Sequence, residues 1–141
     1  MAISERWDIE ALKAGASVAF LLAVPPTLIA RFVIEDTGAT SGWAPLLSLI
    51  AISGFIIGAG QSAWRQNKGT PLLHGMVTTT GVFMVTQSVF ALIKISLGDD
   101  IRIGRILTSL SLAIVAGVIG GLLGSFLKHS GPAPRPINPK P

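Results

Sequence analysis

Four apolar blocks of about 20 residues each dominate this chain and limit the folds that it can adopt. A helix of about 20 residues rises about 30 Å, which is the thickness of the hydrocarbon core of a bilayer. Of the 141 residues, 50% are hydrophobic and only 13% are charged, a balance too apolar for an ordinary soluble domain. The sequence therefore predicts an all-α, polytopic membrane protein with four transmembrane helices in an up-down bundle.

The predicted boundaries rest on residues that suit membrane interfaces and helix ends. Trp43 and Trp64 bracket the second block, and Pro71 opens the third. Pro25 and Pro26 are expected to kink the first helix or to end its regular part. The predicted segments are a cytoplasmic N-terminal segment (1–10), a transmembrane domain (11–128) with spans at about 11–34, 43–64, 71–93 and 106–127, and a disordered, proline-rich cytoplasmic tail (129–141).

Basic residues are divided unequally between the two predicted sides of the membrane. Seven of the eleven lie on the side of both termini and of the turn between the second and third spans. Because cytoplasmic loops are enriched in Lys and Arg, both termini are predicted to be cytoplasmic, in a bacterial inner membrane. Arg65, Lys68 and Lys128 are expected to contact anionic lipid headgroups or a partner protein. Topology accounts for the net charge of +4, so no nucleic-acid partner is expected.

Small residues recur at every fourth position in the second and fourth spans. A glycine inside a helix costs stability unless it lets another backbone come close. We expect these two ladders to pack helices together, either by facing each other near a pseudo-twofold axis or by forming an oligomer face; a glycine-lined pore is the alternative. The ladders are Gly54, Gly58 and Ser62, and Gly117, Gly121 and Ser125.

The two ladders belong to longer segments that resemble each other. Residues 47–65 align with residues 110–128 at an offset of 63, with identity at seven of nineteen positions. An offset of two spans preserves the direction of the chain through the membrane. The alignment therefore predicts a parallel two-helix internal repeat.

The third span is the most polar, and two of its residues share one face. Thr80 and Gln87 are seven residues apart and form a candidate polar interior. Hydrogen bonding between helices is the expected role, and contact with a polar substrate is the alternative. The charged residues near the extracytoplasmic ends of the spans could line an extracytoplasmic mouth, although a loop with interfacial bases is the simpler expectation. These are Arg31, Lys94, Arg102, Arg105, Asp99 and Asp100.

The sequence offers little catalytic chemistry. It has no cysteine, no carboxylate pair within a span and no Ser/His/Asp grouping. "GAGQSAW" lacks the preceding strand and the full spacing of a phosphate-binding loop. His74 and His129 fall near a membrane surface, where we expect them to be solvated or bound to headgroups, because a metal site needs more ligands. No enzymatic activity, metal or cofactor is predicted.

Three motifs carry a family resemblance: "GFIIGA" (54–59), the basic turn "RQNKGT" (65–70) and "PLLHG" (71–75). With the four spans, they resemble a family of small uncharacterised bacterial four-span integral membrane proteins. The resemblance covers about residues 10 to 128 and implies a fold and a location but no catalytic residues.

Membrane lipids, further copies of the chain or a larger membrane-protein complex are the expected partners. We expect a non-enzymatic accessory or structural subunit that associates through its glycine-rich faces. The alternative is a small oligomeric transporter or channel for a polar solute, which would use Thr80, Gln87 and the proline pair of the first span.

Overall fold

The computed structural model describes residues 6–30, 32 and 42–132, and statements about missing features concern these residues alone. It contains the α-helices α1 (Ile9–Ile29), α2 (Trp43–Arg65), α3 (Pro71–Leu97) and α4 (Ile103–Ser130). All four helices are long and apolar enough to cross a membrane, by length and composition. The predicted all-α class with four apolar helices is therefore confirmed.

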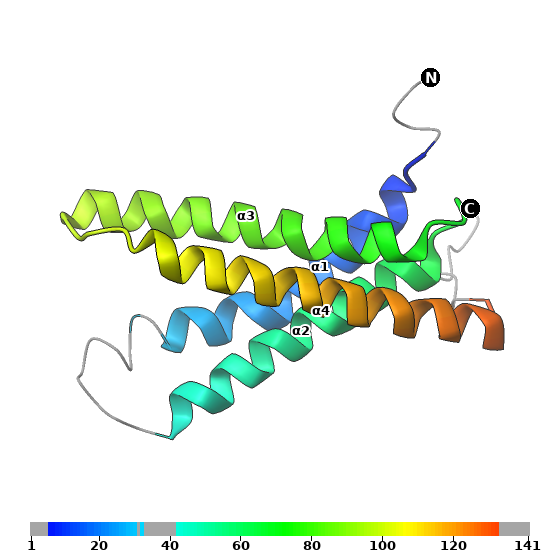
Figure 1. The fold of residues 1–141 in the computed structure, drawn as a ribbon, viewed down its shortest axis with the longest axis horizontal. Helices are drawn as coiled ribbons and strands as arrows, with labels where there is room; N and C mark the ends of the chain where they lie inside the picture. The colour runs from blue at the N-terminus through cyan, green and yellow to red at the C-terminus, as the bar shows by residue number, and fades with distance from the viewer. Residues whose placement is uncertain (1–5, 31, 33–41, 133–141) are drawn as a thin grey trace, which may run out of the picture.

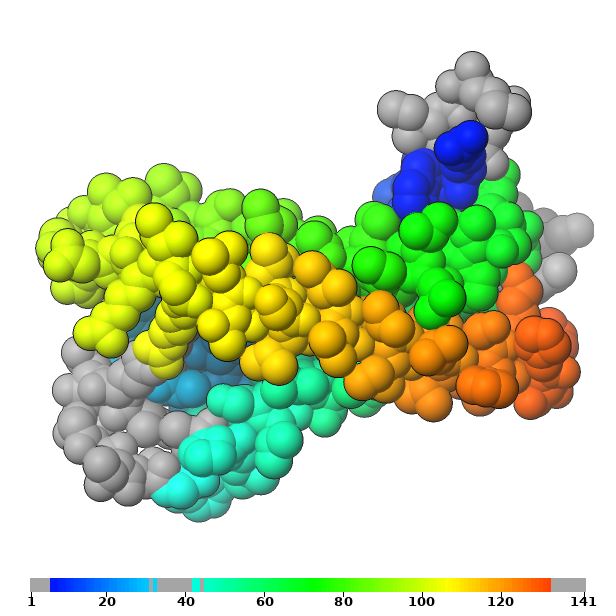
Figure 2. Space-filling model, viewed as in Figure 1, coloured from blue at the N-terminus to red at the C-terminus, as the bar shows by residue number. Residues whose placement is uncertain are grey.

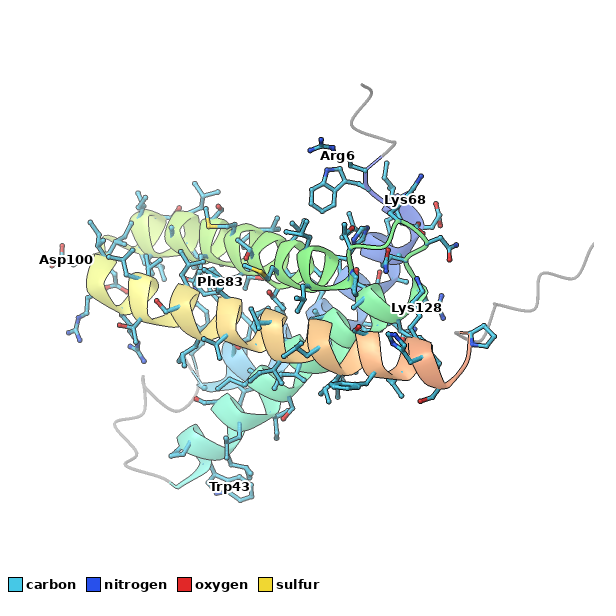
Figure 3. All side chains as sticks on the ribbon, turned by 45° about the vertical axis from the view of Figure 1, so that its right-hand side comes forward. Arg6, Trp43, Lys68, Phe83, Asp100 and Lys128 are labelled. Carbon is cyan, nitrogen blue, oxygen red and sulfur yellow. The ribbon has the colours of Figure 1, made fainter. Side chains whose placement is uncertain are left out.

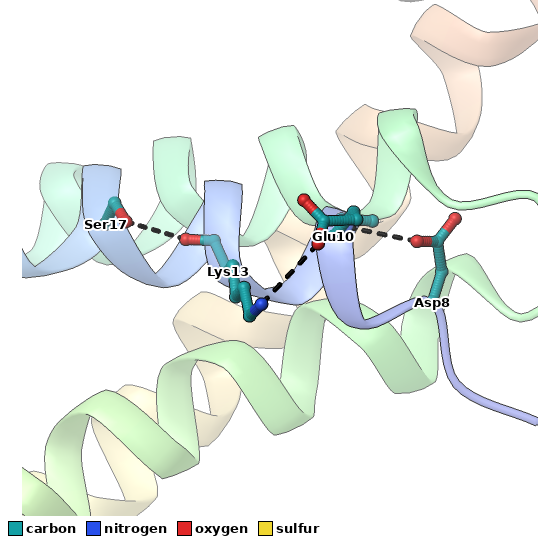
Figure 4. A network of polar contacts seen from close by, with 5 residues as sticks. Asp8, Glu10, Lys13 and Ser17 are labelled. Atoms are coloured by element: carbon teal, nitrogen blue, oxygen red, sulfur yellow. Dashed lines mark hydrogen bonds and ion pairs between the residues drawn. The ribbon is translucent and has the colours of Figure 1, made fainter. Parts of the chain in front are cut away.

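The start of α1 is fixed by local polar contacts (Figure 4). The Asp8 carboxylate accepts a hydrogen bond from the backbone N–H of Ala11 at 3.1 Å, which satisfies one of the free donors of the first turn. Glu10 and Lys13 form an exposed ion pair at 3.5 Å, and the Ser17 hydroxyl donates to the Lys13 carbonyl. The Asp8 cap begins the helix at Ile9, two residues before the predicted span.

Helices α2 and α3 begin at Trp43 and Pro71, as predicted, whereas several other helix ends differ from the predicted boundaries. Helix α1 runs through Pro25 and Pro26 and reaches Ile29. Helix α3 continues to Leu97, where Gly98 ends it with a φ of 77°, a conformation that glycine adopts readily. Helix α4 reaches Ser130 and so includes the first two positions of the tail predicted to be disordered. Residues 133–141 of that tail and residues 31, 33 and 34 of the first predicted span lie outside the described residues.

The helices meet closely at one end and diverge at the other (Figure 1). Helix α2 packs against α1, α3 and α4, and α3 also packs against α4 and α1. We call the "closed end" the one that holds the start of α1, the α2–α3 turn and the end of α4. The "open end" holds the α3–α4 connection, residues 98–102. Figure 2 shows α3 and α4 side by side, with the first turns of α2 lying apart from the first turns of α4 at the open end.

Close backbone packing joins α1 to α2. A methyl group added at Gly58 would lie 2.5 Å from the Cβ of Ala19 and 2.6 Å from the carbonyl oxygen of Gly15. A methyl group added at Gly54 would meet Leu22 at 2.8 Å. Because real Cβ atoms do not come so close, only glycine permits this contact at both positions.

A second pair of glycines, Gly120 and Gly124, joins α4 to α2. An added methyl group would come 2.6 Å from the Cβ of Ala59 at the first position and 2.7 Å from the Cβ of Ala63 at the second. Helices whose backbones approach in this way gain van der Waals contact, which drives helix association in membranes. The α2–α4 interface therefore uses a small-residue face that is not one of the two predicted ladders.

The predicted pairing of the two ladders with each other is wrong. Gly54 and Gly58 lie against α1, whereas an added methyl group at Gly117 would meet the Met76 and Gly75 backbone of α3, and one at Gly121 would meet Leu72. Both α2 and α4 carry small residues on two faces, and each ladder lies on the face that meets the preceding helix. Of the two serines, Ser62 is fully buried in α2, and Ser125 is partly exposed on α4.

Candidate functional site

His74 lies at the centre of a polar network at the closed end. Its side chain is fully buried, so the expectation of a solvated interfacial histidine is wrong. Nε2 accepts a hydrogen bond from the Asp8 backbone N–H at 3.0 Å, which places the ring proton on Nδ1. Nδ1 lies 2.9 Å from the Thr70 carbonyl oxygen and 3.1 Å from the Thr70 hydroxyl. The Trp7 ring lies against the imidazole, with 5.4 Å between ring centroids. His74 therefore fastens the start of α1 to the first turn of α3.

Gln66, directly after α2, joins the same network from the other side. Its side chain is fully buried, and its Oε1 accepts from the backbone N–H of Lys68 at 2.7 Å and of Thr70 at 3.3 Å. Its backbone carbonyl accepts from the Lys128 ammonium group of α4. The only buried side-chain polar atoms without a hydrogen-bond partner in the described structure are Gln66 Nε2 and Ser62 Oγ, one turn apart. The α2–α3 turn is thus held by its own side chains and by α4.

Two further long-range bonds complete the closed end. The Trp64 indole donates to the carbonyl oxygen of Gly131 at 3.0 Å, and the Asn67 backbone N–H donates to the second carboxylate oxygen of Asp8 at 3.2 Å. Every element that reaches this end is therefore tied to the α2–α3 turn or to α2. The polar groups of the closed end are directed at each other, so they join the chain segments that meet there. We call these hydrogen bonds the latches of the closed end.

The three basic residues predicted to meet lipid or a partner all lie at this end. Figure 3 shows Lys68 and Lys128 there, opposite Asp100 at the tip of the α3–α4 connection. The Gln61 amide, oriented with its oxygen toward Arg65, accepts from two nitrogens of that guanidinium at 2.9 and 3.1 Å. Lys68 is exposed, whereas Lys128 already binds the Gln66 carbonyl. The sequence did not predict this bond between Lys128 and the end of α2.

The open end contains two adjoining cavities. The outer cavity, about 420 Å³, lies between the ends of α3 and α4 and is lined by polar and charged residues. The inner cavity, about 240 Å³, lies among all four helices and is mainly apolar. Gln87 and Arg105 line both cavities. The outer lining includes five of the six charged residues for which the sequence left two interpretations open, namely Lys94, Asp99, Asp100, Arg102 and Arg105. The sixth, Arg31, lies outside the described residues.

The two residues of the predicted polar pair on α3, Thr80 and Gln87, differ in their relation to these cavities. Gln87 lies at the junction of the two, whereas Thr80 is a partly exposed residue outside both linings. The buried threonines of α3 are instead Thr78, Thr79 and Thr86. Each donates its hydroxyl proton to a carbonyl of its own helix, for example from Thr86 to Val82 at 2.7 Å. A threonine whose hydroxyl bonds to its own helix can be buried, so a prediction of the buried face from side-chain polarity alone misses it.

The described residues contain no group of three or more His, Asp or Glu side chains that could hold a metal ion. Their polar chemistry is concentrated in the latches of the closed end and in the charged mouth of the open end. No family model, curated protein or solved structure matches this chain.

Proposed function

We propose that this chain is a non-enzymatic subunit of a bacterial inner membrane, with an accessory or structural role beside further copies of itself or within a larger membrane-protein complex. Its four helices form an up-down bundle, and the closed end faces the cytoplasm. Lys68 lies at that end (Figure 3) and Arg65 is the last residue of α2, so both would meet anionic lipid headgroups or a partner.

The observation that carries this proposal is the backbone contact that seals the closed end. Gly15 and Gly58 between α1 and α2, and Gly124 between α2 and α4, leave no room for a side chain between the backbones. Large aliphatic side chains cover the outside, with Leu21 69% exposed. A bundle with a tightly packed closed end and an apolar exterior suits a fixed structural element of the membrane better than an open conduction path.

The orientation can be tested with single cysteines, because the chain has none of its own. We expect a membrane-impermeant maleimide to label Asp100→Cys in intact cells and to label Lys68→Cys only after the membrane is permeabilised. The two residues lie at opposite ends of the molecule (Figure 3). The reverse labelling would overturn the proposed orientation, and labelling of both variants from one side would contradict the up-down bundle.

The subunit role predicts a stoichiometric partner. The full chain, tagged at Met1 and extracted in mild detergent, should elute with a second membrane protein or with further copies of itself. Lys68→Gln should weaken that association if the basic turn contributes to it, and Lys13→Gln is the matched control, because Lys13 already pairs with Glu10. Elution as a lone monomer under conditions that preserve other complexes of the same membrane would contradict the proposal.

A second candidate, a small transporter for a polar solute, is favoured by the position of Gln87 at the junction of two cavities. Such a protein would expose its cavity at one side and open the sealed side in a second state. Uptake of a solute into liposomes that contain only this chain would favour this candidate over the subunit role.

The proposed parallel repeat is supported by matching contacts in the two halves. Gly58 of α2 approaches the Gly15 carbonyl and Ala19, and Gly117 of α4 approaches the Gly75 carbonyl and Thr79. Gly75 follows Gly15 by 60 residues, and Gly117 follows Gly58 by 59. The offset between matching contacts is thus about one helical turn shorter than the offset of 63 in the sequence alignment. Because the small residues recur at every fourth position, a shift of one turn still aligns small residues with small residues.

A further inference from the structure

The two cavities of the open end differ in character and adjoin each other. The outer one is lined largely by polar and charged side chains, and the inner one is lined mainly by apolar side chains such as Ile52, Phe55 and Phe83. Gln87 and Arg105 contribute to both linings, so the cavities adjoin at these two side chains, and a ligand that extends past them would occupy both spaces. Their combined size is that of a small-ligand pocket.

The outer cavity favours a negatively charged group. Among the described residues, three basic ones, Lys94, Arg102 and Arg105, and two acidic ones, Asp99 and Asp100, line it. Arg105 already interacts with another group, so Lys94 and Arg102 are the basic residues that a head group would use. Asp100 lies at the outermost tip of the connection (Figure 3). Helix α4 begins here, with no acidic residue in its first turn and no side chain capping its first amides. The free N–H groups and the positive end of the helix dipole add to the attraction for an anion.

The inner cavity favours a hydrocarbon chain over a polar solute. The hydroxyl groups of Thr27 and Thr86 donate to carbonyl oxygens of their own helices, each at 2.7 Å. These hydroxyl protons are therefore not available to a ligand, and the two threonines contribute mainly their methyl groups to the lining. A space of about 240 Å³ is below the usual range for a drug-sized ligand and suits one chain better than two.

The expected depths of the two cavities in the membrane match their linings, charged in the outer cavity and apolar in the inner one. Trp43, at the start of α2, is 65% exposed at the open end, and exposed tryptophans lie at the level of the lipid headgroups. The charged outer cavity then lies near headgroup level and the apolar inner cavity lies at hydrocarbon depth. An amphiphile already dissolved in the bilayer would meet both in its natural orientation.

We propose that the open end binds a single-chain amphiphile with a phosphate or carboxylate head group. The head group binds Lys94 and Arg102 at the start of α4, and the chain lies among Ile52, Phe55 and Phe83. This site is independent of the proposed subunit role, because none of its residues belongs to the closed end.

The test uses the full chain in neutral maltoside micelles with dodecyl phosphate as the probe, and backbone-amide NMR shifts as the readout. We expect saturable shifts at Gln87 and Ile106. Arg102→Gln should weaken binding about tenfold, because a charge-assisted hydrogen bond contributes about 1.5–3 kcal/mol and 1.4 kcal/mol is tenfold in affinity. Lys68→Gln, at the other end of the molecule, should change affinity less than about twofold.

A second pair of variants tests the inner cavity without removing charge. Ser109 lines that cavity, so Ser109→Phe should fill it and weaken binding about tenfold. Ser111→Phe adds the same ring to an exposed position of the same helix outside both linings and should leave binding unchanged. The thermal unfolding temperature of each variant separates loss of the site from loss of the fold.

Three outcomes would overturn the site. One is equal binding of dodecyltrimethylammonium, whose head group has the opposite charge. Another is equal affinity for inorganic phosphate, which would show that a free anion binds without any use of the apolar cavity. The third is undiminished binding by a folded Ser109→Phe or Arg102→Gln protein.

Discussion

Gly120→Ala should destabilise this protein, although it adds only one methyl group. The new Cβ would overlap the Ile56 carbonyl oxygen of α2 and come 2.6 Å from the Cβ of Ala59. Neither a backbone carbonyl nor a Cβ can rotate away, so α2 and α4 must separate along their contact. Overpacking of this kind costs about 1–3 kcal/mol, and we expect the upper part of that range because backbone atoms are involved. Denaturant titration in mild detergent measures the free energy of unfolding.

Gly81→Ala is the matched control. Gly81 lies within α3, where an added methyl group would meet no atom within 4 Å. The same substitution there should leave stability unchanged or raise it by up to about 1 kcal/mol, because alanine is the better helix former. Losses of equal size at Gly81 and Gly120 would mean that close helix contact is not the reason for glycine at position 120.

His74→Ala should release the start of α1 from the α2–α3 turn. The substitution removes the acceptor for the Asp8 backbone N–H and the donor to Thr70, and it removes the ring against which Trp7 lies. Leaving one buried polar group unpaired costs about 1–3 kcal/mol, and the empty space left by the ring adds to this. We expect a loss of about 2–4 kcal/mol on this basis. Hydrogen exchange should show faster exchange of the Asp8 and Asn67 amides.

His129→Ala provides the comparison for this experiment. His129 is exposed in the last turn of α4, where its Nδ1 lies 2.8 Å from the Ser125 carbonyl oxygen. Its loss should change stability by no more than about 0.5 kcal/mol, as for most surface positions. Unchanged exchange of the Asp8 amide in His74→Ala would refute the role of His74 as a latch.

Hydropathy was sufficient to predict the four helices, because a bilayer requires long apolar segments whatever the helices later contact. It was not sufficient to predict which faces meet. Gly54 and Gly58 recur at the period that places them on one face, but the period does not specify the neighbouring helix. Here that neighbour is α1, whose Gly15 and Ala19 gave no signal as strong as a repeated glycine.

The polar features were harder to predict, because they join residues far apart in the chain. Asp8 and His74 are 66 positions apart, and a histidine near a predicted membrane surface is usually solvated. The best available signal was "PLLHG" itself, which places His74 in the first turn of a helix that follows a tight connection. The open-end cavities depend on how far the helices diverge, and no local pattern in a sequence specifies that divergence.

The bonds from Trp64 to Gly131 and from Lys128 to Gln66 also determine how the protein would carry a mechanical load. They join the last turn of α4 to the last residues of α2, so the segment between them forms a loop closed by side chains. A partner that pulls on the chain beyond Gly131 would therefore load α2 as well as α4. Since α2 contacts each of the other helices, the force would be shared by the whole bundle instead of peeling away its last helix.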